Sequence, residues 1–178
     1  MSCNLTTGFL LGCNDAVGGI KNIYFINYDD ITASTVAAGV LTAVTATNGD
    51  VYLYQPNKNT GSVTFNPTVS LENGTVFFTH QLVFTLGKLS VTKRNELEIL
   101  SRARVVVFVE MNDGQTMVLG LNQGAFMTAG TFQTGAAFGD LQGYQLTFTS
   151  DEPTQPYTLN DADMTTAGYT VSATTEAQ

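Results

Sequence analysis

The most regular pattern in the chain is an alternation of side chains over residues 75–86. One face of this segment carries Val76, Phe78, His80, Leu82, Phe84 and Leu86. The opposite face carries Phe77, Thr79, Gln81, Val83 and Thr85. A period of two residues predicts a β-strand, and twelve residues exceed the usual strand length of about five or six.

A second pattern has no polar face. Residues 105–109 are all apolar, so a strand here should be buried on both sides. Residues 115–121 follow after Asn112-Asp113-Gly114, and Asp-Gly between two apolar runs predicts a β-hairpin. Residues 20–28 also carry large apolar side chains on both faces, which predicts another strand covered on both sides.

Shorter patterns predict further strands at residues 40–44, 51–54, 62–65, 124–131, 144–148 and 169–172, the last of them at a sheet edge. Asn48-Gly49 predicts a hairpin turn between the first two of these strands, and Asn73-Gly74 predicts another tight turn. Pro67 has no N–H group to donate, so we expect its stretch at the edge of a sheet.

Only residues 89–102 favour a helix. Leu97 and Leu100 share one face, and Ser90 or Thr92 could cap the first turn. Glu98 is spaced for i,i+4 ion pairs with Arg94 and Arg102. Five of the seven basic residues lie between positions 88 and 104, which makes this a concentrated patch in an otherwise acidic chain.

Length and composition indicate one β-rich domain of 178 residues, with a loop-rich segment at residues 1–19 and a fraying tail at residues 160–178. Only 12% of the residues are charged, about half the usual share, which suggests a surface covered by other protein. A net charge of −8 argues against a grip on nucleic acid, which needs lysine and arginine on phosphates. It is compatible with a surface past which nucleic acid slides.

The two cysteines, Cys3 and Cys13, are expected to be free thiols in a reducing cytosol. The N-terminal residues lack the basic region of a signal peptide. No run reaches the roughly 18 apolar residues that a membrane span needs. We therefore expect folding in a cytoplasm and no membrane anchor.

The candidate chemistry is sparse. The sequence contains no serine nucleophile motif, phosphate-binding loop or dinucleotide fingerprint. His80, the only histidine, lies on an apolar strand face, where a partnered structural residue is a better interpretation than a catalyst. The aspartate pairs Asp29-Asp30 and Asp161/Asp163 are interpreted as turn residues, because a Ca²⁺ loop needs about six oxygen ligands. We predict no enzyme activity, no metal and no cofactor.

Four stretches resemble bacteriophage tail-tube (major tail) proteins: residues 120–126, 131–140, 139–149 and 152–153. Gly139-Asp140-Leu141-Gln142-Gly143-Tyr144 is similar to the family's Gly-Asp-x-x-Gly-Tyr entry into a late strand with threonine on its outer face. The preceding order of a long strand, a Leu-Arg-Glu helix, an apolar strand and a hairpin is similar too. The resemblance covers residues 75–157, about half of the chain.

This resemblance implies a mainly β fold, a two-sheet β-sandwich or barrel with one flanking α-helix. It further implies that six copies close a ring, with their sheets joined edge to edge around a lumen. The homo-hexameric rings would stack into a tube in the virion tail, assembled in the host cytoplasm together with other tail proteins. DNA would pass through the lumen without specific binding.

Three other classes of protein remain open. One is the tube protein of a contractile injection or secretion system, which would carry effectors. Another is a β-sandwich decoration protein of a virion head or fibre. The third, a carbohydrate-binding module, usually exposes tryptophan in its groove, and this chain has no tryptophan.

Two surfaces are predicted to make contacts in a tube. The polar loop at residues 55–62 resembles a projecting hairpin tip that would contact the next ring. Its candidate contact residues are Asn57, Lys58, Asn59, Thr60 and Gly61. The helix should lie on the outside of the ring, because cations in the lumen would hold DNA. Its candidate contacts with a neighbour or a sheath are Lys93, Arg94, Glu98 and Arg102.

Overall fold

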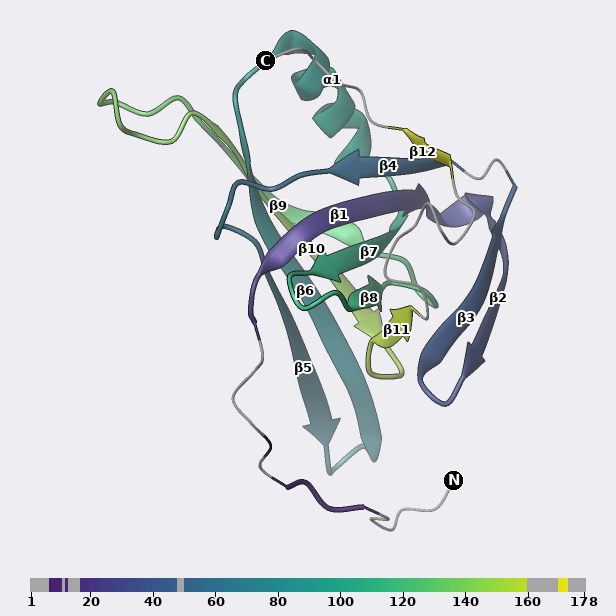
Figure 1. Cartoon of the computed structure of the whole chain (residues 1–178). Coiled ribbons are helices and arrows are strands. Elements are labelled where there is room, and N and C mark those ends of the chain that lie inside the picture. The colour runs from purple at the N-terminus through teal and green to yellow at the C-terminus, as the bar shows by residue number, and fades with distance from the viewer. Residues whose placement is uncertain (1–6, 11, 13–16, 48–49, 160–169, 173–178) are drawn as a thin grey trace.

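The chain folds into two β-sheets and one α-helix over residues 7–10, 12, 17–47, 50–159 and 170–172, which are the residues that the computed structural model describes (Figure 1). The mainly β fold with two sheets and a flanking helix is thereby confirmed.

The larger sheet, called sheet A, has the strand order β12-β4-β1-β7-β8-β11-β3-β2. Its strands are β1 (Ile20–Asn27), β2 (Ile31–Ala37), β3 (Val40–Ala46), β4 (Asp50–Tyr54), β7 (Val105–Met111), β8 (Thr116–Leu119), β11 (Tyr157–Leu159) and β12 (Thr170–Ser172). A short 3-10 helix, η1 (Tyr28–Asp30), joins β1 to β2. The pairs β11–β3 and β12–β4 are parallel, and the other pairs in sheet A are antiparallel.

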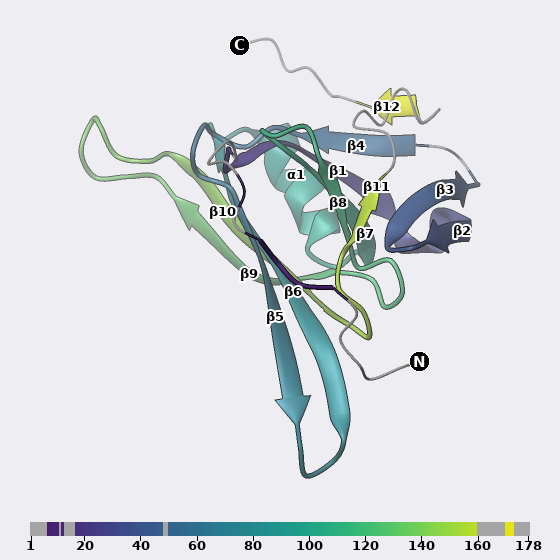
Figure 2. The ribbon, with the colours of Figure 1, turned by 60° about the horizontal axis from the view of Figure 1, so that its bottom comes forward.

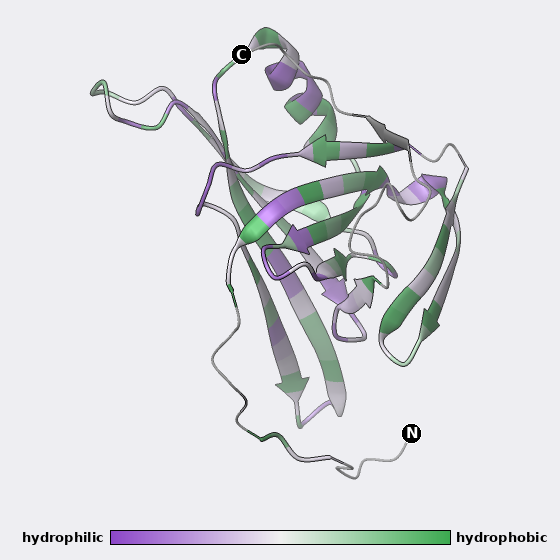
Figure 3. Cartoon of the chain, viewed as in Figure 1, coloured by the Kyte–Doolittle hydropathy of each residue, from purple (hydrophilic) through white to green (hydrophobic). Residues whose placement is uncertain are grey.

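The smaller sheet, called sheet B, has the order β5-β6-β10-β9 and is antiparallel throughout. Its strands are β5 (Ser62–Ser70), β6 (Thr75–Gly87), β9 (Phe126–Gln133) and β10 (Gly143–Glu152). Bands of alternating hydropathy run along β5 and β6, as one expects for strands with one covered and one open face (Figure 3).

Strands β1 and β7 are buried on both faces because each face meets a different hydrophobic core. Their side chains Ile23 and Val107 belong to the core shared with sheet B and the helix. Their side chains Tyr24 and Phe108 belong to a second core, on the other side of sheet A. Both predictions of strands covered on two sides are therefore confirmed.

The second core exists because sheet A curls. Leu41 on β3 and Val51 on β4 lie in the same hydrophobic cluster, although four strands separate β3 from β4 in the sheet. Figure 2 shows β2 and β3 turned away from the line of β1 and β4. The curl brings side chains from both ends of sheet A onto Phe108, which is completely buried.

The helix α1 (Val91–Leu100) packs Leu97 and Leu100 into the core between the sheets. Ser90 caps the helix, since its hydroxyl accepts a hydrogen bond from the backbone N–H of Lys93 at 3.2 Å. The predicted i,i+4 ion pair between Glu98 and Arg102 is present at 2.9 Å.

Local turn signals identified two hairpins and failed for a third. The β7–β8 hairpin turns at Asn112-Asp113-Gly114, and the β5–β6 hairpin turns at Asn73-Gly74, as predicted. Pro67 lies in the edge strand β5. The predicted hairpin between β3 and β4 is wrong, because β3 pairs with β2 and β11 whereas β4 pairs with β1 and β12. The residues of its Asn48-Gly49 turn lie outside the described part.

Candidate assembly surfaces

Sheet B covers the core with one face and leaves the other face open. Strand register places the following side chains of β5, β6 and β10 on the open face: Ser62, Thr64, Asn66, Thr68, Ser70, Thr75, Phe77, Thr79, Gln81, Val83, Thr85, Gln145, Thr147, Thr149 and Asp151. All of these side chains are at least partly exposed except Thr85, which is buried. Hydroxyl and amide groups dominate this set. Asp151 is its only charged member, and it accepts a hydrogen bond from the Thr79 hydroxyl at 2.7 Å.

The strands of sheet B contribute no lysine or arginine to the open face, since none of β5, β6, β9 and β10 contains either residue. The basic residues lie instead on sheet A, on the helix and in the loops. A phosphate chain that approached the open face would therefore meet neutral polar groups and one carboxylate, which cannot hold it by charge.

Both edges of sheet B are formed by long strands. Among the described strands, β5 and β9 each have a sheet partner on one side only. Nearly all of β9 is exposed, including the large side chains Phe126 and Phe132. On β5, Pro67 has no N–H group, so a ladder with a further strand would be interrupted at this residue. Such edges are open to pairing with another chain.

The helix lies on the side of sheet B opposite to the open face, because Leu97 and Leu100 pack on the core side chains of β10. Of the candidate contact residues, Arg94, Glu98 and Arg102 are exposed and Lys93 is half-buried. The structure thus places this charged group away from the open face. Its contact with a neighbour or a sheath stays a prediction.

The loop at residues 55–61 connects β4 of sheet A to β5 of sheet B, so it joins the two sheets and does not form the tip of a hairpin. The backbone N–H of Asn57 donates to the Thr85 carbonyl at 2.9 Å, which ties the start of the loop to β6. Lys58, Asn59 and Thr60 are exposed, and Gly61 packs against Ile20. Contact of this loop with a second ring also stays a prediction.

Replacing Lys58, Asn59 and Thr60 together by Gly, Gly and Ser should leave the subunit folded and impair the stacking of rings that the resemblance to tail-tube proteins implies. These side chains are exposed, and Asn59 has φ +60, which glycine adopts without strain. The free energy of unfolding should change by about 1 kcal/mol or less. Thermal denaturation and negative-stain microscopy measure the two effects, and tubes of normal length would contradict the assigned contact.

His80 and Glu152 form a buried polar cluster beneath the open face. The two Glu152 oxygens accept hydrogen bonds from the backbone N–H groups of Asn122 and Gln123, from the Asn122 side chain and from the Ser150 hydroxyl, at 2.8 to 3.2 Å. Glu152 is only 2% exposed, so these donors replace the water that the carboxylate has lost. Sequence analysis missed this role, since Glu152-Pro153 entered it only as part of the resemblance and nothing local linked Glu152 to residues 122 and 123.

His80 is 2% exposed and lies opposite Ser150 in the strand register. Neither ring nitrogen makes a hydrogen bond of good geometry within the described residues, although the Thr154 backbone lies close enough to act as a weak hydrogen-bond acceptor for the ring. Its ring instead meets the Phe65 ring edge-on, with the centroids 5.1 Å apart.

Burial lowers the pKa of His80 below 6.5, although the nearby charges of Glu152 and Asp151 and the Thr154 backbone oppose this shift. A group that stays neutral in the folded state and takes up a proton in the unfolded state destabilises the fold as the pH falls below 6.5. The free energy of unfolding should therefore decrease between about pH 6.5 and pH 5, before most carboxylates titrate.

The variant His80→Leu should lose this pH dependence and be at least as stable as the wild type at pH 7, because leucine leaves no buried polar group unpaired. Urea denaturation at half-unit steps from pH 5 to pH 7 measures the effect. An equal slope in the wild type and the variant would show that another group titrates in this range.

Glu110 on β7 forms a second buried carboxylate site at the end of the other core. Burial by itself would raise the pKa of Glu110, but hydrogen bonds from Lys21, Asn22 and Tyr24 bring it below the usual value. The Asn22 amide donates at 2.7 Å and the Tyr24 hydroxyl at 3.1 Å. The site fastens β1 to β7, and its groups are already occupied by one another.

No group of three or more acidic, histidine or cysteine side chains in the described part of the chain is placed to hold a metal ion. Asp30 of the Asp29-Asp30 pair accepts a hydrogen bond from Asn27 at 3.1 Å. Asp161, Asp163, Cys3 and Cys13 lie outside the described residues. The ten-residue helix α1 cannot cross a membrane, and neither can any other described helix.

Comparison with known proteins finds no matching family model, no similar curated protein and no similar solved structure. The comparisons therefore assign this chain to no family.

Proposed function

We propose that this chain is the structural subunit of a bacteriophage tail tube, in which stacked hexameric rings conduct the genome during ejection. The observation that carries the proposal is sheet B, which combines an open face free of lysine and arginine with long edge strands on both sides. The resemblance of residues 75–157 to tail-tube proteins adds to it.

The two edges suit a ring. A contact in which the edge of β5 meets the edge of β9 from the next copy joins two different surfaces, and repetition of such a contact closes into a ring when the rotation allows it. Every edge of sheet B would then be covered, which removes the aggregation hazard of exposed edges. Pro67 confines the ladder on β5 to the residues on either side of it.

The open face of sheet B suits the wall of the lumen. Threonine, serine, asparagine and glutamine side chains give a wetted surface, while the single carboxylate Asp151 repels phosphate. The helix α1, with its cations, lies on the opposite side of the sheet and would face outward. Because the wall offers no cations to replace the counterions of DNA, DNA could then slide along the lumen without being bound to it.

Negative-stain microscopy and light scattering of the purified chain test this proposal. We expect rings, and stacks of rings at higher concentration. We also expect no retention of double-stranded DNA above background at physiological salt. A compact monomer across wide ranges of concentration and salt would overturn the proposal, and so would micromolar DNA binding with a steep salt dependence.

A further inference from the structure

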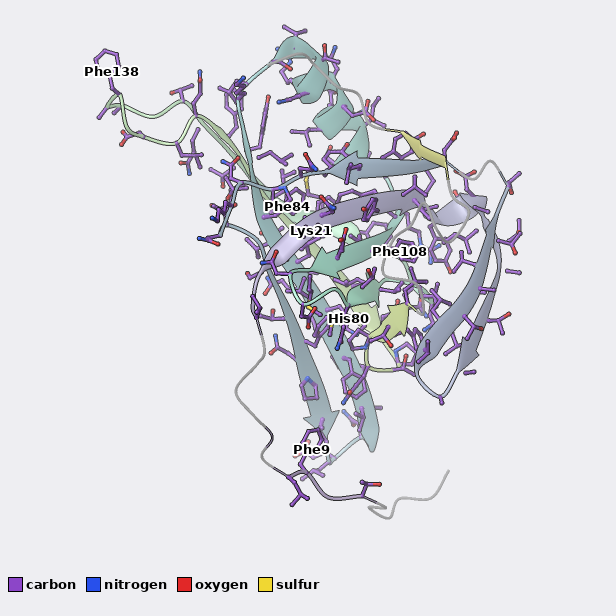
Figure 4. All side chains as sticks on the ribbon, viewed as in Figure 1. Phe9, Lys21, His80, Phe84, Phe108 and Phe138 are labelled. Carbon is purple, nitrogen blue, oxygen red and sulfur yellow. The ribbon has the colours of Figure 1, made fainter. Side chains whose placement is uncertain are left out.

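The loop between β9 and β10, residues 134–142, extends away from the body of the molecule and carries a phenylalanine at its tip. Figure 4 shows Phe138 at the outermost point of this loop. The Phe138 side chain is fully exposed, so it contacts no core of its own subunit. A single exposed hydrophobic residue is common on protein surfaces and proves nothing alone. What distinguishes Phe138 is the way in which its loop is held.

The loop has a defined shape. Asp140 Oδ2 accepts hydrogen bonds from the backbone N–H groups of Ala136 and Ala137, both at 2.8 Å, and these bonds lower the pKa of the Asp140 carboxyl group. Gly135 has φ +72, and a Cβ atom there would lie 2.6 Å from Asp140 Cβ, so only glycine fits. The loop is therefore organised before any partner arrives, which lowers the entropy cost of docking.

The same chain carries an unfilled apolar groove of about 370 Å³ between α1 and the strands β9 and β10. Its apolar lining consists of Leu97, Met127, Gly130, Phe132, Tyr144 and Leu146. Gly130 leaves space on the strand, because an added Cβ would come no nearer than 3.5 Å to the Leu146 side chain. The rings of Phe132 and Tyr144 lie tilted against each other with their centroids 5.4 Å apart, at the ends of β9 and β10 from which the loop extends.

The charges of the loop and the groove complement each other. Arg94 lies on the rim of the groove and makes no ion pair within the described residues, whereas Glu98 on the same rim is already paired with Arg102. Asp140 uses only Oδ2 in its loop, and Oδ1 makes no hydrogen bond within the described residues. The positive charge of Arg94 beside the groove thus complements the negative charge of Asp140, which lies two residues from Phe138 in the loop.

The geometry points to a contact between two copies of this chain, in which the Phe138 loop of one copy, residues 134–142, fills the groove between α1 and β9 of another. The loop leaves the molecule from the strands that form its own groove and extends away from it (Figure 1), so the occupant comes from a second copy. Asp140 of one copy would then face Arg94 of the other.

This contact deepens the proposed function and rests on it, because it names one interface between tube subunits. A phenylalanine side chain buries at most roughly 250 Å², far less than the about 800 Å² per partner of a stable interface. The loop therefore adds an anchor to the edge pairing of sheet B and does not replace it. Truncation of a central aromatic anchor weakens an interface on the order of 30-fold.

Two experiments test the contact. In the first, Phe138→Ala should raise the protein concentration at which assembly begins by about 30-fold. The control is Phe9→Ala, which removes an equally exposed phenylalanine from another segment and should leave that concentration unchanged. Thermal denaturation should give the same melting temperature for both variants and the wild type, since neither side chain is buried in its own subunit.

In the second, Gly139→Cys and Gly130→Cys are placed on separate chains in which Cys3 and Cys13 are serine, so that Phe138 itself is kept; an added Cβ at Gly139 meets no atom within 4 Å. Oxidation of the mixture should link the two different chains, as mass spectrometry detects. The control mixture pairs Gly139→Cys with Thr35→Cys on the exposed strand β2 and should give only background linkage. The Gly130 site accepts the new side chain at ordinary contact distances.

The outcomes separate the two proposals. Rings or tubes that form equally well from wild type and Phe138→Ala, with only background linkage, would overturn the loop contact and leave the proposed function standing. Specific linkage without rings or tubes would support the contact and count against the tube. A wild-type chain that neither assembles nor cross-links would overturn both.

Discussion

In the proposed tube, a lysine in place of Gln81 is expected to make the lumen retain DNA that the wild-type lumen would release. Gln81 lies on β6 in the middle of the open face of sheet B, between Thr64 and Thr149. In a hexameric ring, six new cations would converge on the lumen, although the charge of each subunit changes only from −8 to −7. If all six engage phosphates, the logarithm of DNA affinity should fall with the logarithm of salt with a slope of about −5.

The measurement is co-sedimentation of a short linear DNA duplex with assembled tubes, at salt concentrations from 50 to 200 mM, over which affinity should drop roughly 10³-fold or more. Thr35→Lys on the exposed strand β2 adds the same charge elsewhere and is the matched control. The uncharged variant Gln81→Met controls for the altered side chain. Equal retention by the Gln81 and Thr35 lysine variants would show that the open face is not the wall of the lumen.

The second large effect is expected at Glu152, whose loss should destabilise the subunit by about 3–5 kcal/mol. In Glu152→Ala, the N–H groups of Asn122 and Gln123 lose their acceptor in a site that water does not reach freely. For a chain of this size, the melting temperature should fall by about 10 °C. The carboxylate thus fastens the turn that leads into β9.

Calorimetry of Glu152→Ala and Ser150→Ala distinguishes the loss of the acceptor for the backbone N–H groups from the loss of a single side-chain hydrogen bond. Ser150→Ala removes one donor to Glu152 and keeps its backbone partners, so it should cost only about 1 kcal/mol. A loss below about 1 kcal/mol in Glu152→Ala would mean that water replaces the carboxylate and that the turn does not depend on it.

Strands with a clear hydrophobic pattern, or with a clear turn signal beside them, could be predicted from the sequence. Strand β6 follows a period of two, and β7 and β8 flank an Asp-Gly turn, so each is specified by its own residues. The cation-free strands of sheet B were visible in the sequence as well. That they form one sheet with an open face became clear only when the strands were paired.

The rest depends on contacts between residues far apart in the chain. Strand β2 has only small, exposed side chains after Ile31, and β11 has three residues, so neither shows a period. Asn48-Gly49 predicted pairing of β3 with β4, but β3 pairs with β2 and β11 and β4 pairs with β1 and β12, and most of these partners are distant in the sequence. The groove between α1 and β9 likewise joins residues about 30 positions apart.

The sharing of β1 and β7 by two cores has a consequence for the way in which the subunit opens. Ile23 and Val107 hold one core, while Tyr24 and Phe108, their neighbours in the same strands, hold the other. Neither core can melt without exposing a face of these strands, so the two should unfold as one cooperative unit. The amide hydrogens of β1 and β7 should then exchange with solvent only through global unfolding, whereas the exposed edge strand β9 exchanges through local opening.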